Sequence, residues 1–508
     1  MTQIKNPISS VSSAVKIVDG LDELKNQFTS DAARQILRLL DQLSRKKIND
    51  TDSLVRYHET LLFLRAYPQN SAIVRAAENE LRVFASRVSA LDVDLAPLQH
   101  PEVSGIAGTS VTDTFSFYIV RWLSQRHAAE VAIDWEWFED ENRLAETWPR
   151  FMPLLEEDTF VEANIPYREW LAAARKGRPE LAWLIDRFNA LPKTDKERAE
   201  LYNSQQLYVR WTPDFNASRT GMRLPKRRLF YHRGPLIPRR DVDLAKSLVQ
   251  PVTLKKLSER QGERAIDMAR EASTIRYREL YGFTHGDPKH VYHAELGRGV
   301  ELFLMGLPAN KRLPLRVYHA AMIYKNGVPI GYFEGLSLFE RMEGGFNLYY
   351  TFRDGETAWL YARTLNVMHQ FAGVTAFSLD PYQVGHENEE GIESGAFWFY
   401  RKLGFRPTSK DALQLTLKEE EKIRTRKGYR TPASTLRKLA ASSMIFELDS
   451  KRRGDWDRFQ VRKIGFKAQR MKNVLSLIKA KLGPEEVTYL RLMQKDEKLR
   501  RAIIKLGS

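Results

Sequence analysis

The sequence predicts an α+β protein with a mixed, mostly antiparallel sheet and flanking helices, preceded by an α-helical domain and followed by a basic helical tail. Three observations lead to this prediction. Apolar residues recur at helical spacing through roughly the first 200 positions. Between residues 291 and 352 the spacing changes to a period of two, with glycine-containing turns between the runs. Lysine and arginine then accumulate toward the end of the chain.

Residues 1–207 are predicted to form the α-helical domain. Thr29, Ser30 and Asp31 have side chains that cap helix N-termini, and apolar residues follow them at three- and four-residue spacing. Further segments with this spacing follow, and Pro68 ends one of them. Short connections between consecutive helices favour an antiparallel arrangement. The pattern predicts architecture here and does not indicate a function.

The next segment, residues 208–245, is predicted to be a basic connector. Its spacing is irregular and prolines interrupt it, so neither helix nor strand is favoured. Phe230 and Tyr231 lie among cations that no acid separates. Such a segment can attract nucleic acid or another polyanion, and a solvated loop is the alternative. The cations, all within 219–240, are Arg219, Arg223, Lys226, Arg227, Arg228, Arg233, Arg239 and Arg240.

Residues 246–415 are predicted to contain the sheet. Helical spacing continues to about residue 281, after which the period of two begins. Asn326-Gly327 is the strongest hairpin signal, because a type I′ turn needs positive φ at both central positions. A helix and a short apolar run follow the strands. The expected strands cover 291–295, 300–307, 315–325, 328–339 and 346–352, the helix covers 355–372, and the apolar run covers 374–379.

Residues 416–508 are predicted to be the basic helical tail. From residue 409 to 508 the chain has 26 lysines and arginines against 12 acidic residues, so this region carries +14 of the net charge of +16. A charge of this size would attract a polyanion such as RNA, and a solvated tail is the alternative.

The most informative stretch is GIESGAFWFYRKLGF, residues 391–405. Ser394 can cap a short helix, and apolar residues recur after it at three- and four-residue spacing. Gly404 can adopt the left-handed conformation that ends a helix, and Phe405 starts an extended segment. The pattern therefore places the Tyr400 hydroxyl on a helix beside the sheet.

The end of this stretch, AFWFYRKLGF, resembles the terminal motif of the GNAT superfamily of acyl-CoA N-acyltransferases. The order of strands and helices resembles the GNAT core over 315–406, and more loosely over 250–314. The resemblance implies a GNAT-like sheet that splits to admit acetyl-CoA or another acyl-CoA as co-substrate. It also implies that Tyr400 protonates the departing thiolate. Glu393 stands where the family usually has asparagine, and it is a candidate substrate contact.

The junction between the last strand of the meander and the following helix is the candidate coenzyme A site. Free amides and the helix dipole favour an anion there, and GNAT proteins hold the pyrophosphate of coenzyme A at this junction. Gly355 fits the middle glycine of the family pattern, whereas Phe352 stands where arginine or glutamine is usual. Glu356 would repel a pyrophosphate if it pointed inward. The candidate residues are Arg353, Asp354, Gly355, Glu356, Thr357 and Ala358.

Transfer to an amine needs a base that removes the amine's proton. Glu334 is the candidate catalytic base, because it shares one face of an expected strand with apolar neighbours, and a surface position on the sheet is the alternative. In the polar loop 380–393, His386 and Glu389 are candidates to contact the acceptor. An acidic loop at this place would favour a cationic acceptor such as a polyamine, a lysine or an aminoacyl group.

Two groups of residues have a spacing that a metal ion could use, and neither is assigned as a metal site. One contains a Gly-Asp-Pro turn, so its side chains need not converge. The other is better explained as a solvated acidic helix face. The groups are His285, Asp287, His290 and His293, and Asp134, Glu136, Glu139 and Asp140.

Composition excludes several classes of site. The chain has no cysteine, so disulfides, thiolate metal ligands and cysteine nucleophiles are absent. An acyl group would therefore pass directly to its acceptor or through another residue type. No apolar run approaches the roughly 18 residues needed to cross a bilayer, and no signal pattern opens the sequence. We therefore expect a cytoplasmic protein without a membrane partner.

Two functions follow from these observations. The first is an N-acyltransferase that moves an acyl group, most simply acetyl, from acyl-CoA to an amine on a small molecule or a protein by direct attack. The alternative is a non-catalytic GNAT-like scaffold that binds RNA or another polyanion through 219–240 and 409–508. Tyr400 and Gly355 favour the enzyme, whereas Phe352, Glu356 and Glu393 favour the scaffold.

Overall fold

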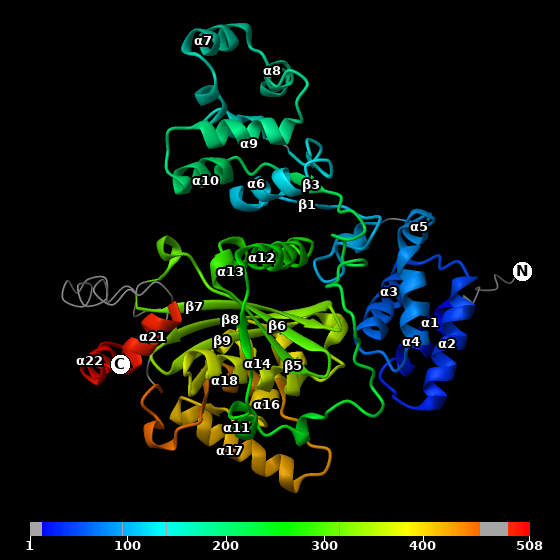
Figure 1. The fold of residues 1–508 in the computed structure, drawn as a ribbon, viewed down its shortest axis with the longest axis vertical. Coiled ribbons are helices and arrows are strands. Elements are labelled where there is room, and N and C mark those ends of the chain that lie inside the picture. Colours follow the sequence, from blue (N-terminus) through cyan, green and yellow to red (C-terminus); the bar gives the residue numbers. More distant parts are fainter. Residues whose placement is uncertain (1–12, 94, 139, 314, 458–485, 508) are drawn as a thin grey trace, which may run out of the picture.

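The computed structural model describes residues 13–93, 95–138, 140–313, 315–457 and 486–507 (Figure 1). A bundle of helices lies beside a large sheet domain, and a second helical part projects away from the sheet. Across these residues, no helix combines the length and the apolar character needed to span a membrane.

The first helices form a bundle whose N-termini are capped by polar residues. Thr29 accepts a hydrogen bond from the Ala32 N–H at 3.1 Å, and Asp50 accepts one from the Ser53 N–H at 2.8 Å. Helix α3 is buried along most of its length because it contacts both its neighbours and the sheet domain. The helices are α1 (Ser13–Leu24), α2 (Ser30–Ser44), α3 (Thr51–Ala66), α4 (Ser71–Arg82) and α5 (Phe84–Ser89).

The second helical part also contains a small sheet, which the sequence analysis did not anticipate. Strand β3 lies between β1 and β2, antiparallel to both. Each strand has three residues, too few for a period of two to be recognised. The elements are β1 (Val111–Asp113), α6 (Phe117–Arg126), β2 (Val131–Ile133), α7 (Leu154–Ala163), α8 (Tyr167–Ala174), α9 (Glu180–Ala190), α10 (Asp195–Ser204) and β3 (Val209–Trp211).

The main sheet has nine strands in the order β11-β12-β10-β9-β8-β7-β6-β5-β4. All neighbours are antiparallel except β9 and β10, which confirms a mixed, mostly antiparallel sheet. The strands are β4 (Leu254–Lys256), β5 (Val291–Gly297), β6 (Val300–Met305), β7 (Val317–Lys325), β8 (Val328–Leu338), β9 (Arg341–Leu348), β10 (Ala376–Leu379), β11 (Arg406–Pro407) and β12 (Met444–Glu447).

Strand β9 differs from the expected strand 346–352. Gly344 and Gly345 lie within β9, although the sequence favoured a turn at these glycines. A β-carbon on Gly344 would come within 2.8 Å of the Phe333 ring, so the close approach of that ring requires glycine. The chain after Leu348 is a short 3₁₀ turn, Tyr350–Phe352, rather than a strand.

Helices cover both faces of the main sheet (Figure 1). Helices α12 and α13 lie on one face, and α11, α14, α16 and α17 lie on the other. The helices are α11 (Leu244–Leu248), α12 (Glu259–Thr274), α13 (Tyr281–Thr284), α14 (Thr357–Ala372), α15 (Glu389–Glu393), α16 (Ala396–Arg401), α17 (Lys410–Thr425), α18 (Ala433–Ala440), α21 (Glu486–Gln494) and α22 (Glu497–Gly507).

The basic connector is tied to the two parts that it joins. The His232 N–H donates to the Pro68 carbonyl at 2.8 Å, and the Leu224 N–H donates to the Gly327 carbonyl at 2.8 Å. Three of the cations in 219–240 form ion pairs with residues far away in the sequence, so they contribute less to an exposed basic surface than the sequence suggested. These pairs are Arg219–Glu59 (2.6 Å), Arg223–Glu78 (2.6 Å) and Lys226–Glu301.

The sheet extends past residue 415, the expected end of the sheet-bearing domain. Strand β12 lies inside the sheet, between β10 and β11. Helices α21 and α22 also contact the sheet domain: the Gln494 amide donates to the Phe339 and Ala372 carbonyls, each at 2.9 Å. Strand β12 and helices α21 and α22, all from the predicted basic tail, thus pack as parts of the sheet domain. Residues 458–485 of the tail lie outside the described residues.

Candidate active site

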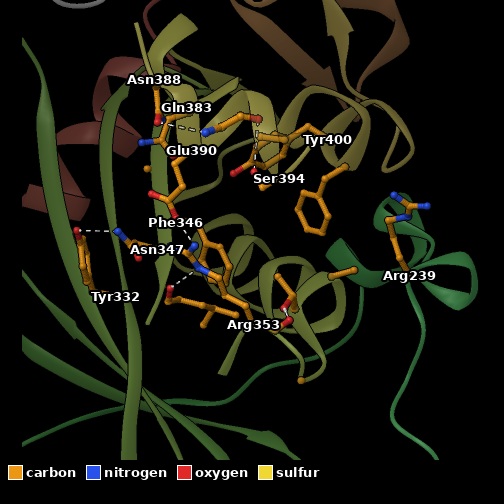
Figure 2. Close-up of a pocket in the computed structure, with 18 of the residues that line it drawn as sticks. Arg239, Tyr332, Phe346, Asn347, Arg353, Gln383, Asn388, Glu390, Ser394 and Tyr400 are labelled. Atoms are coloured by element: carbon orange, nitrogen blue, oxygen red, sulfur yellow. Dashed lines mark hydrogen bonds and ion pairs between the residues drawn. The ribbon is translucent and has the colours of Figure 1, made fainter. Parts of the chain in front are cut away.

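A cleft opens where β9 and β10 separate. The two strands pair at only three positions, the last being Glu343 opposite Ser378, and then diverge. The end of β9, the start of α14, and the segment from η8 (Pro381–Val384) to α16 line a cavity of about 610 Å³ at this point. Figure 2 shows Tyr400 and Ser394 above this cavity and Phe346, Asn347 and Arg353 below it.

The N-terminus of α14 forms one wall of the cleft, through Arg353, Gly355, Thr357 and Ala358. Among the described residues, no acceptor binds the backbone N–H of Thr357 or Ala358, as expected for the first turn of a helix. The Arg353 guanidinium donates to the Leu348 carbonyl at 3.3 Å and forms an ion pair with Glu390 across the cleft. This wall therefore offers free N–H groups and a cation to an anion.

Glu356 does not line the cleft. Its side chain is buried on the other side of the helix terminus, where Arg298 binds both carboxylate oxygens. The Lys325 ammonium lies 3.5 Å away, and the Ile237 N–H donates to the carboxylate at 3.1 Å. The sequence suggested that Glu356 would repel a pyrophosphate if it pointed into the cleft. Because Glu356 points away and is paired with cations, we do not expect this repulsion.

Asp354 also lies outside the cleft lining, in an ion pair at 3.0 Å with Lys25, which directly follows α1. Gly355 lines the cleft and at the same time lies against the helical bundle. A β-carbon on Gly355 would come within 2.5 Å of the Tyr67 hydroxyl at the end of α3. The helical bundle thus packs against the N-terminus of α14 on the side opposite the cleft.

Tyr400 lies on α16 and lines the cleft. Its ring packs edge-on against Tyr361, with ring centroids 5.5 Å apart, and against Phe405, at 5.8 Å. Burial raises the pKa of the Tyr400 phenol, so the hydroxyl keeps its proton at neutral pH and can donate it. Ser394, expected to cap this helix, instead ends α15, and Gly395 precedes α16 in the left-handed conformation.

Glu334 lines the same cleft from β8 and is partly exposed. The Tyr318 hydroxyl of β7 donates a hydrogen bond to it. Burial, together with the negative charge of Glu334, raises the pKa of the Tyr318 phenol. The Tyr318 hydroxyl therefore stays protonated and donates to one carboxylate oxygen of Glu334.

Three cleft residues near Glu334 escaped the sequence analysis. Tyr332 shares its face of β8, and the Tyr332 hydroxyl accepts hydrogen bonds from Arg278 at 2.8 Å and Asn347 at 3.3 Å. The alternation of β8 was the available signal for Tyr332. Arg278 lies between α12 and α13, far away in the sequence, so no local pattern could place it here.

The loop 380–393 reaches the cleft, but not through the residues that were expected. His386 and Glu393 are exposed and do not line it, and Glu389 pairs with Arg437 of α18 at 2.8 Å. Hydrogen bonding from Arg437 lowers the pKa of Glu389. Helical spacing in α15 directs other positions inward. The lining residues from this segment are Tyr382, Gln383, Asn388, Glu390, Gly391 and Ser394.

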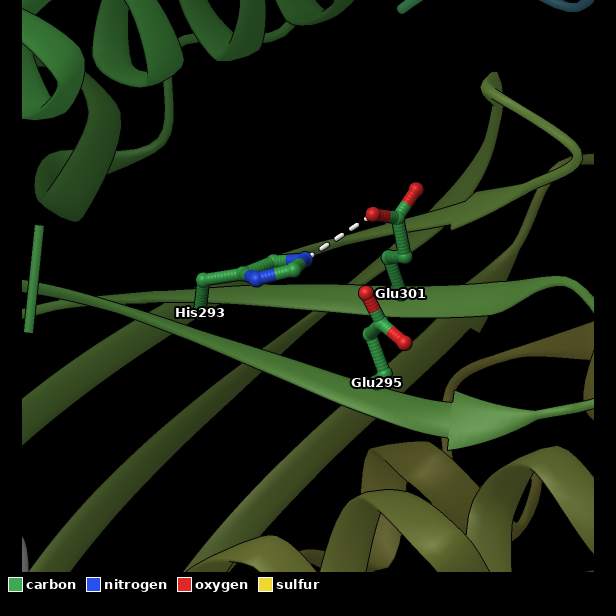
Figure 3. A group of neighbouring side chains, drawn as sticks. All are labelled: His293, Glu295 and Glu301. Carbon is green, nitrogen blue, oxygen red and sulfur yellow. Dashed lines mark hydrogen bonds and ion pairs between the residues drawn. The ribbon is translucent and has the colours of Figure 1, made fainter. Parts of the chain in front are cut away.

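The histidine run does not converge on one point. His285 packs against the Tyr118 ring, with centroids 4.6 Å apart, and His290 binds Asp287 at 2.8 Å. His293 binds Glu301 at 2.9 Å beside Glu295, as Figure 3 shows. Lys226 also pairs with Glu301, so an ammonium already neutralises this carboxylate.

The acidic residues in 134–140 are the second set with a possible metal-ligand spacing, and two of them are also held by separate contacts. Asp134 is buried and lies 3.6 Å from Arg210 of β3, whereas Asp140 caps a 3₁₀ turn. Glu139 lies outside the described residues.

Comparison with known proteins adds no relative: no family model, curated protein or solved structure matches this chain. The function is therefore inferred from the geometry of the cleft.

Proposed function

We propose that this protein is an N-acyltransferase that moves an acyl group, most simply acetyl, from acyl-CoA to an amine by direct attack. One observation supports the proposal above all. A single cleft, formed where two parallel strands separate, brings together a helix N-terminus, a carboxylate and a protonated tyrosine. The reaction needs a site that binds the anionic pyrophosphate, a base that takes the proton of the amine and an acid that protonates the thiolate. The three groups of the cleft can fill these roles.

The pyrophosphate of the acyl-CoA would bind at the start of α14. The free N–H groups of Thr357 and Ala358 point to an anion site, and the helix dipole has the correct sign. Arg353 would exchange its ion pair with Glu390 for a phosphate oxygen. Arg239, on the connector, also lines the cleft and adds a second cation at this end.

The chemical step needs one base and one acid. The amine nitrogen attacks the thioester carbonyl carbon, and Glu334 accepts the proton that the nitrogen loses. The carbon–sulfur bond then breaks, and the Tyr400 hydroxyl gives its proton to the departing thiolate. The chain has no cysteine, so no thiol of the enzyme could hold the acyl group between two steps.

Calorimetric titration with acetyl-CoA tests the proposal. Arg353→Met should weaken binding about tenfold or more, because a charge-assisted contact to phosphate contributes roughly 1.5–3 kcal/mol. Arg437→Met is the matched control: Arg437 also pairs with a glutamate of α15 but does not line the cleft. This variant should bind like the wild type.

Absence of binding by acetyl-CoA and by longer acyl-CoAs would refute the proposal. RNA would then be the next titrant, because the alternative is a scaffold that binds a polyanion. Binding that weakens equally in both variants would place the acyl-CoA elsewhere on the protein.

A further inference from the structure

The lining of the cleft includes a solvent-exposed cation, Arg278, and a half-buried anion, Glu334, that do not pair with each other. Arg278 donates one hydrogen bond, to the Tyr332 hydroxyl at 2.8 Å, and forms no ion pair with any described residue. Glu334 receives a hydrogen bond from Tyr318 and, among the residues described, likewise has no cationic partner. Both side chains line the cleft.

Both charges are held at neighbouring positions of β8: Glu334 belongs to this strand, and Arg278 is bound to its Tyr332. Tyr332 and Glu334 are two residues apart on β8, so they share one face and their Cα atoms are separated by about 6.6 Å. Asn347 of β9 also binds the Tyr332 hydroxyl, which holds the ring at which Arg278 is anchored. The guanidinium keeps its remaining donors for a group in the cleft.

We infer that the acceptor is a free amino acid, or another compound whose carboxylate lies next to its amine; this inference rests on the proposed function. The carboxylate would bind the Arg278 guanidinium, whose fork of donors matches two oxygens. The amine would lie at Glu334, which takes its proton when the nitrogen attacks. A zwitterion of this kind can pair with both charges at once, its carboxylate with Arg278 and its amine with Glu334.

The same charges argue against other amines. A polyamine has no anion for Arg278, and the guanidinium would repel its second ammonium group. The N-terminus of a protein likewise lacks a carboxylate beside its amine. The acidic loop suggested a cationic acceptor. Arg278 and Glu334 together favour those cationic acceptors that also carry a carboxylate next to the amine.

An acceptor panel provides the test, with acetyl-CoA as donor and products identified by mass spectrometry. The twenty amino acids are compared with their amides and with the corresponding decarboxylated amines. The wild type should prefer the acid over its amide by about 10- to 100-fold in kcat/KM. Arg278→Met should abolish this preference and leave the Kd for acetyl-CoA unchanged.

Arg264→Met is the control, because Arg264 lies on the exposed side of α12 and does not line the cleft. It should keep the preference. Acetylation of amides or plain amines as fast as amino acids, no acetylated amino acid at all, or an undiminished preference in Arg278→Met would overturn the inference. Failure of the proposed function is distinguished by the titration, since in that case acetyl-CoA itself does not bind.

Discussion

At the scale of single residues, burial decides what the ionisable side chains of the cleft can do. Tyr400 is surrounded by Tyr361, Phe399 and Phe405, and no cation of the described residues offsets the effect of burial on its phenol. Its pKa is therefore raised, and the group acts as a proton donor, not as a base. Tyr382 lines the same cleft but is more than half exposed, so it provides a natural comparison.

Tyr400→Phe should lower kcat by about 100-fold while the Kd for acetyl-CoA stays within a factor of two, because only the proton donor is removed. Tyr382→Phe should change neither constant. Stopped-flow measurement of thiol release, alongside calorimetry, checks both variants. A Tyr400→Phe enzyme of normal kcat would show that another group, or water, protonates the thiolate.

His319, on β7, is a second residue whose behaviour follows from burial. Burial lowers its pKa from 6.5 to about 4, with smaller contributions from Arg312 and His290. The unfolded chain binds a proton at pH 6.5 and below, whereas the folded protein does so only near pH 4. The neutral histidine therefore costs nothing above pH 6.5, and stability is lost as the pH falls from 6.5 to 4.

His319→Gln should remove this loss, which amounts to about 3 kcal/mol for a shift of this size. Urea midpoints measured at pH 7.5, 6 and 4.5 give the comparison. The wild type should lose more stability than the variant over this range. His386→Gln, at an exposed position, should follow the wild type. Parallel curves for the wild type and His319→Gln would contradict the assignment.

At the scale of elements, α14 links the helical bundle to the cleft. Its N-terminus presents free N–H groups on one side, while Glu356 and Asp354 are bound on the other by Arg298 and Lys25. Gly355 lies in between, against the Tyr67 hydroxyl. The orientation of this anion site therefore depends on a helix that lies almost 300 positions earlier in the chain.

Gly355→Ala should lower the free energy of unfolding by about 1–3 kcal/mol, because its β-carbon would overlap with Tyr67 and with the Phe352 carbonyl. It should also weaken acetyl-CoA binding, since relief of the overlap shifts the start of α14. Gly234→Ala is the control, as a β-carbon there meets nothing within 4 Å. Thermal unfolding and calorimetry measure the two effects. An unchanged melting temperature in Gly355→Ala would mean that Tyr67 moves freely.

At the scale of the whole molecule, segments from both ends of the chain are fastened to the sheet domain. The Asn326 amide of the β7–β8 turn donates to the Ala66 carbonyl at 2.9 Å, and Arg219 joins the connector to Glu59. At the other end, Arg500 of α22 pairs at 2.6 Å with Glu340, which lies in the turn between β8 and β9. Arg500 and neighbouring cations lower the pKa of Glu340, although burial acts in the opposite direction.

Arg500→Met should destabilise the protein by about 2 kcal/mol, because Glu340 then keeps, among the described side chains, Arg452 and the Trp456 indole as partners. Arg501→Met is the matched control: its side chain is 80% exposed, and its pair with Glu497 contributes little. Urea unfolding of the two variants measures the difference. Equal stability would mean that α22 is not needed to hold the sheet domain together.

The sequence by itself determined the types of the main elements and part of the site. Alternation and the Asn326-Gly327 turn predict β7 and β8, and both turn residues have positive φ, as a type I′ turn requires. Gly404 has the expected left-handed conformation, at φ 99°. Local spacing, together with the resemblance to the GNAT motif, directed attention to Glu334, Tyr400 and the start of α14, and all three line the cleft.

Only the tertiary structure decided which side chains face the cleft. Glu356 turns away because Arg298 and Lys325 come from distant hairpins, and Glu389 turns away because Arg437 follows in α18. Arg278 reaches the cleft from the connection between α12 and α13, and β12 enters the sheet between two strands that precede it in the chain. The physical reason is common to all four. Ion pairs, hydrogen bonds and strand insertion join residues far apart in the sequence, whereas periodicity reports only which face of its own element a residue occupies.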